Sequence, residues 1–354
     1  MKVLLTGGAG YIGSACLRWL LWQGVDAYAF DNLSEGNAAA VPDGRLIVGD
    51  ILDRAALARA LRGHKIDAVM HFAAVASVPD SIADPDTYYR VNVEGTKAVL
   101  DAMRDAGVGQ IVFSSTAATY GLTGDMPLRE DSPQAPAVPY GTTKLAAEWL
   151  IKDYSRAYGL GYALMRYFNA SGADGDGRHG EARRHESHLI PLALAATLGQ
   201  RPPLKVFGGD LPTRDGSCVR DFVHVEDIAQ AHLLALQALR PGTGEAYNIG
   251  SGRGVTVREV LRACEVVTGR PVPHEVVGPR PGDPAVLIAS PEKLVRQLGW
   301  KPRHAGIHAI VETAWRWHRG HPHGYAPAGG ATPPGRAARI PPATKPRRRR
   351  AATV

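Results

Sequence analysis

The sequence predicts an α/β fold, a Rossmann-like doubly wound parallel sheet completed by a smaller mixed α/β lobe. Short β-branched runs, such as residues 2–6 and 110–115, alternate through the first half with helical patterns such as residues 11–24 and 92–107. A strand followed by a helix, repeated along the chain, is typical of a parallel sheet with helices on both faces. A glycine-rich stretch directly after the first strand strengthens this prediction.

The regular alternation of strand and helix patterns ends after about residue 170. Loops rich in glycine and proline, such as "FGGDLPTRDGS" and "VGPRPGDPA", now separate the helical patterns. We therefore expect a Rossmann domain over residues 1–170 and a smaller lobe over residues 171–319 that completes a cleft. Some exchange of chain between the two lobes is compatible with this pattern.

Composition indicates a globular chain with a sizeable core, because 45% of its 354 residues are hydrophobic. Cys16, Cys218 and Cys264 are far apart and form no C-x-x-C pair, so we expect packing residues rather than disulfides or a zinc site. No apolar run approaches the roughly 20 residues of a membrane helix. The start "MKVLLTGGAG" turns glycine-rich too soon for a signal peptide, so we expect a cytoplasmic protein.

The net charge of +7 belongs to the end of the chain. Seven of the 41 Lys and Arg residues and none of the 34 acids follow Gly320, which leaves 34 cations against 34 acids in residues 1–319. The segment 320–354 is rich in Pro, Ala, Gly and Arg, and this composition predicts disorder. We expect no nucleic-acid partner beyond nonspecific attraction to this basic tail, and no membrane partner.

The glycine-rich stretch "TGGAGYIG" places Gly7, Gly10 and Gly13 at three-residue intervals between a strand and a helix. Such a loop lets the backbone approach a pyrophosphate and aims the helix N-terminus at its charge. The next strand ends in Asp31, where an acid accepts the ribose hydroxyls of adenosine and repels a 2′-phosphate. The sequence therefore predicts NAD rather than NADP. Asp50 follows the third strand and is compatible with either an adenine contact or a helix N-cap.

The stretch "PYGTTK" places Tyr140 four residues before Lys144 in a helical pattern, so both side chains point the same way. A cation beside a phenol favours phenolate, which makes the tyrosine a usable general base. The alternative is a tyrosine at the helix entry and a solvated lysine. Thr116 ends a preceding strand, and chemistry in a parallel sheet gathers beyond the carboxyl ends of the strands. We therefore expect Thr116, Tyr140 and Lys144 to meet.

With these motifs the chain resembles the extended short-chain dehydrogenase/reductase superfamily. Within it, "GGAGYIGS", "FSSTAATYG", "RYFNASGAD", "VRDFVHVEDIAQAH" and "RPGDPA" are similar to the UDP-glucose 4-epimerase family over residues 1–317. The resemblance implies an NAD-dependent isomerase that interconverts UDP-glucose and UDP-galactose through a 4-keto sugar, within galactose metabolism. It also implies a UDP-hexose substrate and a homodimer. Tyr140 is then the base, Thr116 holds the sugar oxygen, and Lys144 lowers the tyrosine pKa and binds the nicotinamide ribose.

The resemblance extends to the binding residues, with one departure at Ala76, where some members place a lysine near the cofactor. The positions that it assigns to NAD are Gly7, Gly10, Tyr11, Ile12, Gly13, Asp31, Asn32, Asp50, Ile51, Phe72, Ala73, Ala74, Asn92, Tyr140, Lys144 and Phe168. The positions that it assigns to the UDP-sugar are Thr116, Asn169, His188, Leu189, Phe207, Arg220, Arg280, Asp283 and Leu287.

Several alternatives stay open at this stage. Another NAD-dependent epimerase, a dehydratase or a decarboxylase acting on a nucleotide sugar has the same fold, and so does a dinucleotide-binding regulator without catalysis. Dehydratases of the superfamily usually carry an Asp-Glu pair where this chain has Ala117 and Ala118. No metal site is expected, because "RRHESH" lacks the H-E-x-x-H pattern.

Overall fold

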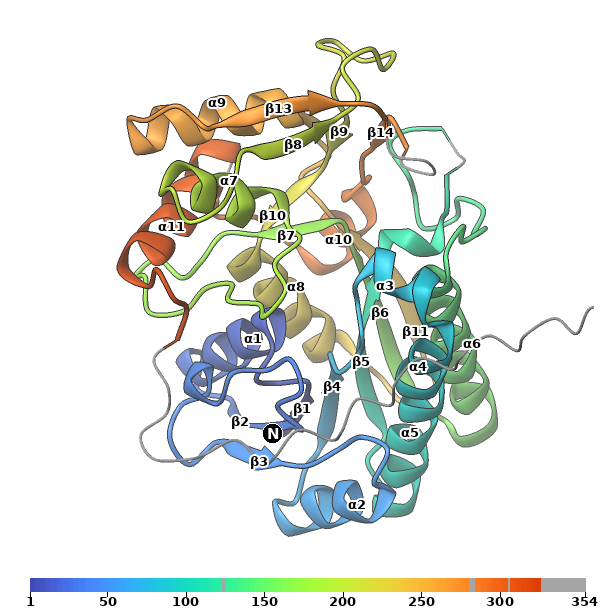
Figure 1. Ribbon diagram of the computed structural model, residues 1–354. Coiled ribbons are helices and arrows are strands. Elements are labelled where there is room, and N and C mark those ends of the chain that lie inside the picture. The colour runs from blue at the N-terminus through green and yellow to red at the C-terminus, as the bar shows by residue number, and fades with distance from the viewer. Residues whose placement is uncertain (123–124, 280–283, 305, 326–354) are drawn as a thin grey trace, which may run out of the picture.

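The computed structural model describes residues 1–122, 125–279, 284–304 and 306–325. Arg280, Asp283 and the part of the predicted tail from residue 326 onward therefore lie outside the described residues. Figure 1 shows a large sheet with helices on both faces and a smaller lobe beside it. This architecture confirms the predicted α/β class.

The large sheet has seven strands in the order β11-β6-β5-β4-β1-β2-β3, and every pairing between neighbours is parallel. The order turns around at β1, and loops beyond the carboxyl ends of the strands at such a switch point form the ligand crevice of this fold class. The strands are β1 (Lys2–Thr6), β2 (Asp26–Asp31), β3 (Leu46–Val48), β4 (Ala68–His71), β5 (Gln110–Thr116), β6 (Gly161–Tyr167) and β11 (Gly244–Ile249).

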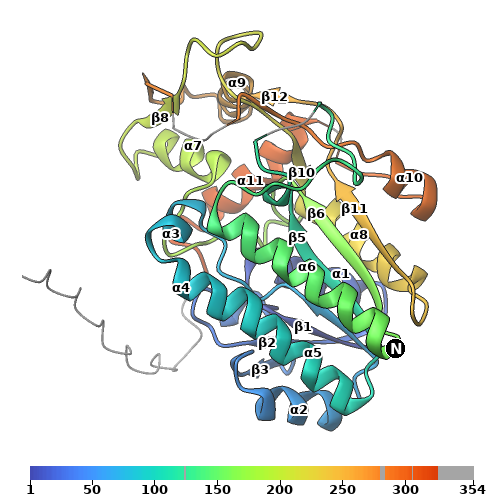
Figure 2. The same ribbon diagram turned by 90° about the vertical axis from the view of Figure 1, so that its right-hand side faces the viewer.

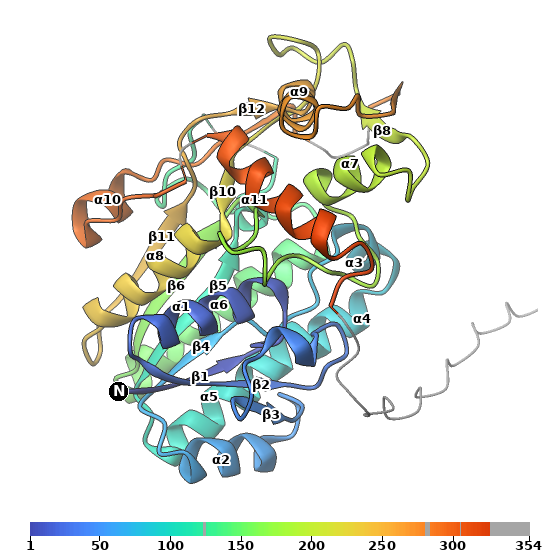
Figure 3. The same ribbon diagram turned by 90° about the vertical axis from the view of Figure 1, so that its left-hand side faces the viewer.

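Helices cover both faces of this sheet. Successive side chains of a strand point to opposite faces, so neighbouring residues of one strand belong to different hydrophobic cores. Leu5 of β1 belongs to the hydrophobic core under α1 (Tyr11–Trp22) and α8 (Val225–Ala238). Figure 3 shows these two helices side by side over one face of the sheet. Its neighbour Leu4 belongs to the core under α2 (Arg54–Gly63) and α5 (Gly95–Ala106). The helix α6 (Pro139–Tyr158) packs on the same side as α5, as Figure 2 shows.

Short elements connect these layers. The helices α3 (Val78–Ala83) and α4 (Pro85–Tyr88) lead through a π-helical turn (Tyr89–Glu94) into α5. Single 3₁₀ turns follow β2 and β5 at Ala38–Ala40 and Ala117–Thr119.

The smaller lobe has its own hydrophobic core, which includes Ile190, Leu261 and Val311. Its helices are α7 (Leu189–Thr197), α9 (Val257–Thr268) and α11 (Ile307–Gly320), whereas α10 (Glu292–Leu298) packs against β11 and α8 of the large sheet. Its strands form three small sheets: β7 (Asn169–Ser171) with β10 (Phe222–His224), β8 (Leu204–Phe207) with β13 (His274–Val277), and β9 (Val219–Arg220) between β12 (Val255–Thr256) and β14 (Val286–Leu287).

The chain passes between the lobes more than once. Both α8 and β11 lie in the range predicted for the smaller lobe, yet they complete the large sheet and cover one face of it. Beyond α11, the Tyr325 hydroxyl donates to the Gly180 carbonyl oxygen at 3.1 Å, so the chain is packed as far as Tyr325. The division at residue 170 stays a prediction. Along the described ranges, no helix combines the length and the apolar character that crossing a membrane requires.

Candidate active site

The glycine loop connects β1 to α1 with almost no room for side chains. Gly7 has a φ of 69°, which favours glycine, and a Cβ there would lie 2.4 Å from the Ala73 nitrogen. A Cβ at Gly13 would lie 2.2 Å from the Gly7 carbonyl oxygen. Gly10 is the N-cap of α1, and the first turn of the helix carries no acidic side chain. The loop therefore leaves backbone amides and a helix N-terminus open to an anion.

Asp31 stands at the end of β2 and is 8% exposed. Its Oδ2 accepts from the Ala9 amide at 2.9 Å and its Oδ1 from the Leu33 amide at 2.8 Å, which ties the carboxylate to the glycine loop. Burial raises the pKa of Asp31, against these two hydrogen bonds. The structure thus brings the predicted ribose-binding acid next to the predicted pyrophosphate loop.

Asn32 and Asp50 also come together, because Asn32 Nδ2 donates to Asp50 Oδ2 at 3.0 Å. Asp50 Oδ1 accepts from the Leu52 amide at 2.8 Å. The N-cap of α2 is Asp53, which accepts from Ala56, so the alternative of Asp50 as the helix cap is wrong. The Asp50 carboxylate instead lies beside Asn32 at the edge of the predicted adenosine pocket.

The loop after β4 packs directly against the glycine loop. The amides of Phe72 and Ala73 both donate to the Thr6 carbonyl oxygen, at 2.8 and 3.0 Å. Asn92, which is 2% exposed, accepts from the Val75 amide at 2.9 Å. The remaining predicted NAD positions follow the same edges: Tyr11 and Ile12 open α1, Ile51 follows β3, Ala74 follows Ala73, and Phe168 follows β6.

Thr116 and Tyr140 meet beyond the carboxyl end of β5. Val138 is the N-cap of α6 and Pro139 its first residue, so Tyr140 is held in the first turn. The Thr116 side chain lies beside the Tyr140 hydroxyl, and the Tyr88 ring stands edge-on to the Tyr140 ring, with 6.5 Å between the ring centres. Burial raises the pKa of Tyr140, while the neighbouring Thr116 side chain and the charge of Arg183 oppose this effect. The strand and the helix thus place a hydroxyl pair at the crevice.

Lys144 lies one helical turn after Tyr140 and is 2% exposed. Its Nζ is 4.3 Å from the centre of the Phe113 ring. Burial lowers the pKa of Lys144 to about 7, although the charge of Glu148 opposes this shift. The alternative of a solvated surface lysine is therefore wrong.

The predicted substrate residues that the structure describes after Thr116 lie on several elements of the smaller lobe. Asn169 opens β7, His188 is the N-cap of α7, and Leu189 is the first residue of that helix. Arg220 and Leu287 are paired in the ladder between β9 and β14. Phe207 ends β8.

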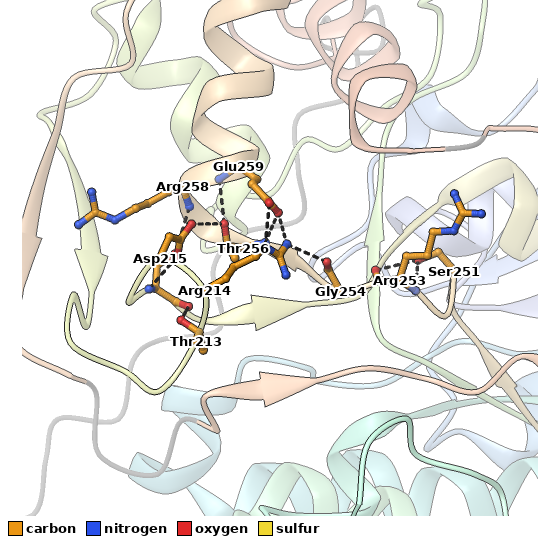
Figure 4. Close-up of polar contacts among 10 residues, drawn as sticks. Thr213, Arg214, Asp215, Ser251, Arg253, Gly254, Thr256, Arg258 and Glu259 are labelled. Atoms are coloured by element: carbon orange, nitrogen blue, oxygen red, sulfur yellow. Dashed lines mark hydrogen bonds and ion pairs between the residues drawn. The ribbon is translucent and has the colours of Figure 1, made fainter.

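The loop that follows β8, residues 208–217, is clamped to the start of α9 (Figure 4). Arg214 Nε donates to Glu259 Oε1 at 2.8 Å. Thr256, the N-cap of α9, donates from its hydroxyl to Asp215 Oδ2 at 2.5 Å. These contacts join the end of β8, predicted to line the uracil slot, to a helix of the smaller lobe.

Two buried carboxylates, one on α6 and one before α7, were not predicted from the sequence. Glu148 on α6 is 0% exposed and pairs with Arg166 of β6, whose Nη2 is 2.6 Å from its Oε2. Glu181, in the segment between β7 and α7, is 3% exposed and contacts both Arg183 and His188. Glu148 follows Lys144 by four residues on the same helix, so the sequence spacing could have placed it on the same face. Glu181 lies in a segment without periodicity, so no sequence pattern indicates its position.

Among the described residues, two groups of side chains lie close enough together to hold a metal ion: His224, Glu226 and His304, and Glu181, Glu186 and His188. The first group has competing partners, since His224 Nδ1 accepts from the Glu226 amide and its Nε2 contacts the Thr313 hydroxyl. In the second group the Arg183 guanidinium already neutralises the carboxylate of Glu181.

A family model described as the NAD dependent epimerase/dehydratase family matches residues 3–250. The chain belongs to this family. The match covers the glycine loop, the Thr116 strand, the Tyr140 helix and the strands β6 to β11.

Within the family, the chain is similar to UDP-glucose 4-epimerases, which confirms the resemblance seen in the sequence. It is 49% identical over 327 residues to the UDP-glucose 4-epimerase of Halalkalibacterium halodurans, with 92% of this chain and 98% of the relative covered. A crystal structure of the Brucella ovis UDP-glucose 4-epimerase in complex with NAD is 44% identical, with a TM-score of 0.86 over 89% of this chain and 97% of the other. The Bifidobacterium longum enzyme in complex with NAD⁺ and UDP is 33% identical, with a TM-score of 0.87 over 92% and 100%.

Proposed function

We propose that this chain interconverts UDP-glucose and UDP-galactose by epimerisation at C4, with NAD bound in the crevice at the glycine loop. The observation that carries the proposal is the placement of Thr116 at the end of β5 beside Tyr140 in the first turn of α6, with the buried Lys144 one turn further along that helix. The names of the relatives and of the solved neighbours support the same reaction.

The residues around the glycine loop fit NAD. A Cβ at Gly7 or Gly13 would clash with the backbone of Ala73 or Gly7, so this tight turn requires glycine, and it leads directly into the N-terminus of α1, whose positive end favours a phosphate. The carboxylate of Asp31 stands at the end of β2, where the adenosine ribose lies in this fold class. When bound, NAD would supply a reversible hydride acceptor for C4 of the sugar.

The side chains of the crevice then move and hold the proton. Tyr140 as phenolate takes the proton of the sugar 4-hydroxyl and later returns it. Thr116, which lies beside the Tyr140 hydroxyl, holds the reacting oxygen. Lys144 binds the nicotinamide ribose and, when protonated, favours the phenolate. Its pKa of about 7 makes its charge sensitive to pH in the neutral range.

The substrate residues are proposed to hold the nucleotide more firmly than the hexose. Asn169, His188 and Arg220, together with Arg280, offer donors for the diphosphate. The carboxylate of Asp283 accepts from the uridine ribose hydroxyls. Leu189 and Phe207 line the uracil slot. Leu287, next to Arg220 in the β9–β14 ladder, forms the wall beside the sugar.

The 3₁₀ turn after Thr116 favours epimerisation over dehydration. Ala117 and Ala118 occupy this turn, and neither can act as the acid or base of an elimination. The chain therefore has no proton-transfer groups for dehydration at the two positions after Thr116.

We also propose a homodimer that uses the outer face of α6. Trp149 of this helix is 57% exposed, and large aromatic side chains are enriched in interfaces. Sedimentation velocity of the purified protein tests the dimer, and a monomer at micromolar concentration would contradict it.

The test of the reaction is to mix the purified protein with UDP-galactose, without added NAD, and to measure UDP-glucose. We expect conversion, because tightly held cofactor is regenerated in each cycle. A second arm with added NAD separates lost cofactor from lost function. No conversion in either arm overturns the proposed function.

A further inference from the structure

The carboxylate of Glu181 joins two cationic side chains between β7 and α7. Its Oε1 lies 2.7 Å from Arg183 Nε, in a hydrogen bond. The same oxygen lies 2.7 Å from His188 Nδ1; this separation is that of an ion pair, although its angles are not those of a hydrogen bond. Glu181 is 3% exposed, so it is a buried anion held by these two partners.

The backbone around Glu181 is fixed from both lobes. Trp317 of α11 donates from its indole nitrogen to the Glu181 carbonyl oxygen at 3.0 Å. Asn37, in the loop after β2, donates to the Ala182 carbonyl oxygen at 2.9 Å. The acid therefore stands where the smaller lobe meets the predicted NAD pocket, on backbone that has little freedom to move.

The imidazole of His188 presents its other edge outward. Its Nδ1 is buried against Glu181, whereas the side chain as a whole is 42% exposed. The exposed part is thus the edge that carries Nε2. His188 is also the N-cap of the nine-residue helix α7, whose first turn carries no acidic side chain, so the helix terminus favours an anion at the same place.

We propose that Glu181 is a positioning residue of the UDP-sugar site, whose carboxylate orients the His188 imidazolium and the Arg183 guanidinium toward the diphosphate of the substrate. This inference rests on the proposed function, since that function supplies the diphosphate. Glu181 itself touches no substrate; it acts through the two cations, and a charged imidazole donates a stronger hydrogen bond to a phosphate oxygen than a neutral one.

The charges around His188 agree with this role. Burial alone lowers the pKa of His188, but the charge and the contact of Glu181 outweigh it and raise the pKa above its ordinary value. The Arg183 charge lowers this pKa and the Glu186 charge raises it. Around Glu181 itself, the facing groups are Tyr11 of α1 and His318 of α11, and its own pKa falls to about 2.

The experiment measures KM and kcat for UDP-galactose between pH 5.5 and 8.5 in Glu181→Gln and in His188→Asn. In Glu181→Gln we expect KM to rise about tenfold near neutral pH, because a charge-assisted hydrogen bond is weakened, while kcat changes by no more than about twofold. Without Glu181 the pKa of His188 falls, so the imidazole loses its charge at a lower pH. The rise of KM with pH should therefore begin at a lower pH in Glu181→Gln than in the wild type. His188→Asn should lose this rise, and adding Glu181→Gln to it should have little further effect.

Two controls separate positioning from folding. Glu186→Gln changes the neighbouring acid, which accepts from the amides of Ser187 and His188 at 2.8 Å, and should shift the KM profile much less. Glu181→Asp keeps the charge and should recover much of the affinity. A folded Glu181→Gln protein with the wild-type KM profile overturns the inference, and so does a loss confined to kcat.

Calorimetric titration with UDP serves if the chain does not epimerise UDP-galactose. UDP carries the diphosphate without the sugar, so weaker UDP binding by Glu181→Gln supports the inference even when the proposed reaction fails. UDP binding that is equal in the wild type and in Glu181→Gln overturns the inference alone.

Discussion

Glu148 and Arg166 form a fully enclosed ion pair directly behind the predicted catalytic residues. Arg166 Nε donates to Glu148 Oε1 at 2.9 Å and its Nη2 to Oε2 at 2.6 Å, while the Ser115 hydroxyl donates to Oε1 at 2.6 Å. The two side chains are 0% and 2% exposed. Glu148 is one turn after Lys144 on α6, so this pair fixes the active helix against β5 and β6.

Glu148→Ala should destabilise the protein by about 3–5 kcal/mol, because it leaves the buried Arg166 charge without its partner. The measurement is the free energy of unfolding in urea. The matched control is Glu245→Ala, which removes the 52%-exposed partner of Lys293 and should cost less than about 1 kcal/mol. Equal losses in the two variants would contradict the importance of burial.

Tyr140→Phe should lower kcat by about 10²–10⁴-fold, the range of general acid–base catalysis, because it removes the phenol and little else. The NAD content of the purified protein and its melting temperature should stay close to those of the wild type. Turnover, bound cofactor and thermal unfolding are measured on the same preparation. Near wild-type turnover would remove Tyr140 from the role of base.

Asp31→Asn should weaken NAD binding by about tenfold or more, because a charge-assisted hydrogen bond to the ribose becomes a neutral one. Binding is measured by titrating NAD into protein from which the cofactor has been removed. Asp53→Asn is the control: it replaces the N-cap of α2 by another good capping residue and should leave NAD binding unchanged. Equal NAD affinity in Asp31→Asn and wild type would place the ribose elsewhere.

Leu287→Ala should improve UDP-N-acetyl sugars as substrates relative to UDP-glucose and UDP-galactose. A medium-sized apolar wall discriminates only modestly, by roughly 1–3 kcal/mol for a methylene-sized change, so the wild type should turn the N-acetyl sugars over slowly. The comparison is kcat/KM for both sugar pairs in both proteins. An unchanged ratio would mean that Leu287 has no contact with the C2 substituent.

Acid should remove the stabilisation that Glu181 provides. Its folded-state pKa of about 2 is below the ordinary glutamate value, so its contribution is complete above the unfolded-state pKa and is lost as the pH falls from there toward 2. The gap in unfolding free energy between wild type and Glu181→Gln should be on the order of 2–3 kcal/mol at pH 7 and should narrow below about pH 4.5. Urea unfolding at pH 7, 5 and 4 measures it. A constant gap would contradict the shifted pKa.

Local patterns in the sequence determined the fold class, the predicted dinucleotide loop and the predicted catalytic pair Tyr140 and Lys144. The glycine spacing around Gly7 and Gly13, the acid at Asp31, and the helical step from Tyr140 to Lys144 each depend on residues close together in the chain. Strand and helix periods and the behaviour of glycine are local properties, so they are readable without coordinates.

Tertiary structure alone decided which distant residues share a site and how their charges behave. Packing of β9 beside β14 put Arg220 next to Leu287, and the return of α11 to the β7–α7 segment buried Glu181 between Arg183 and His188. Lys144 reads as a charged residue in the sequence, but burial lowers its pKa to about 7. Burial and electrostatic coupling depend on the distances between segments that are far apart in the chain, and the order of residues does not contain those distances.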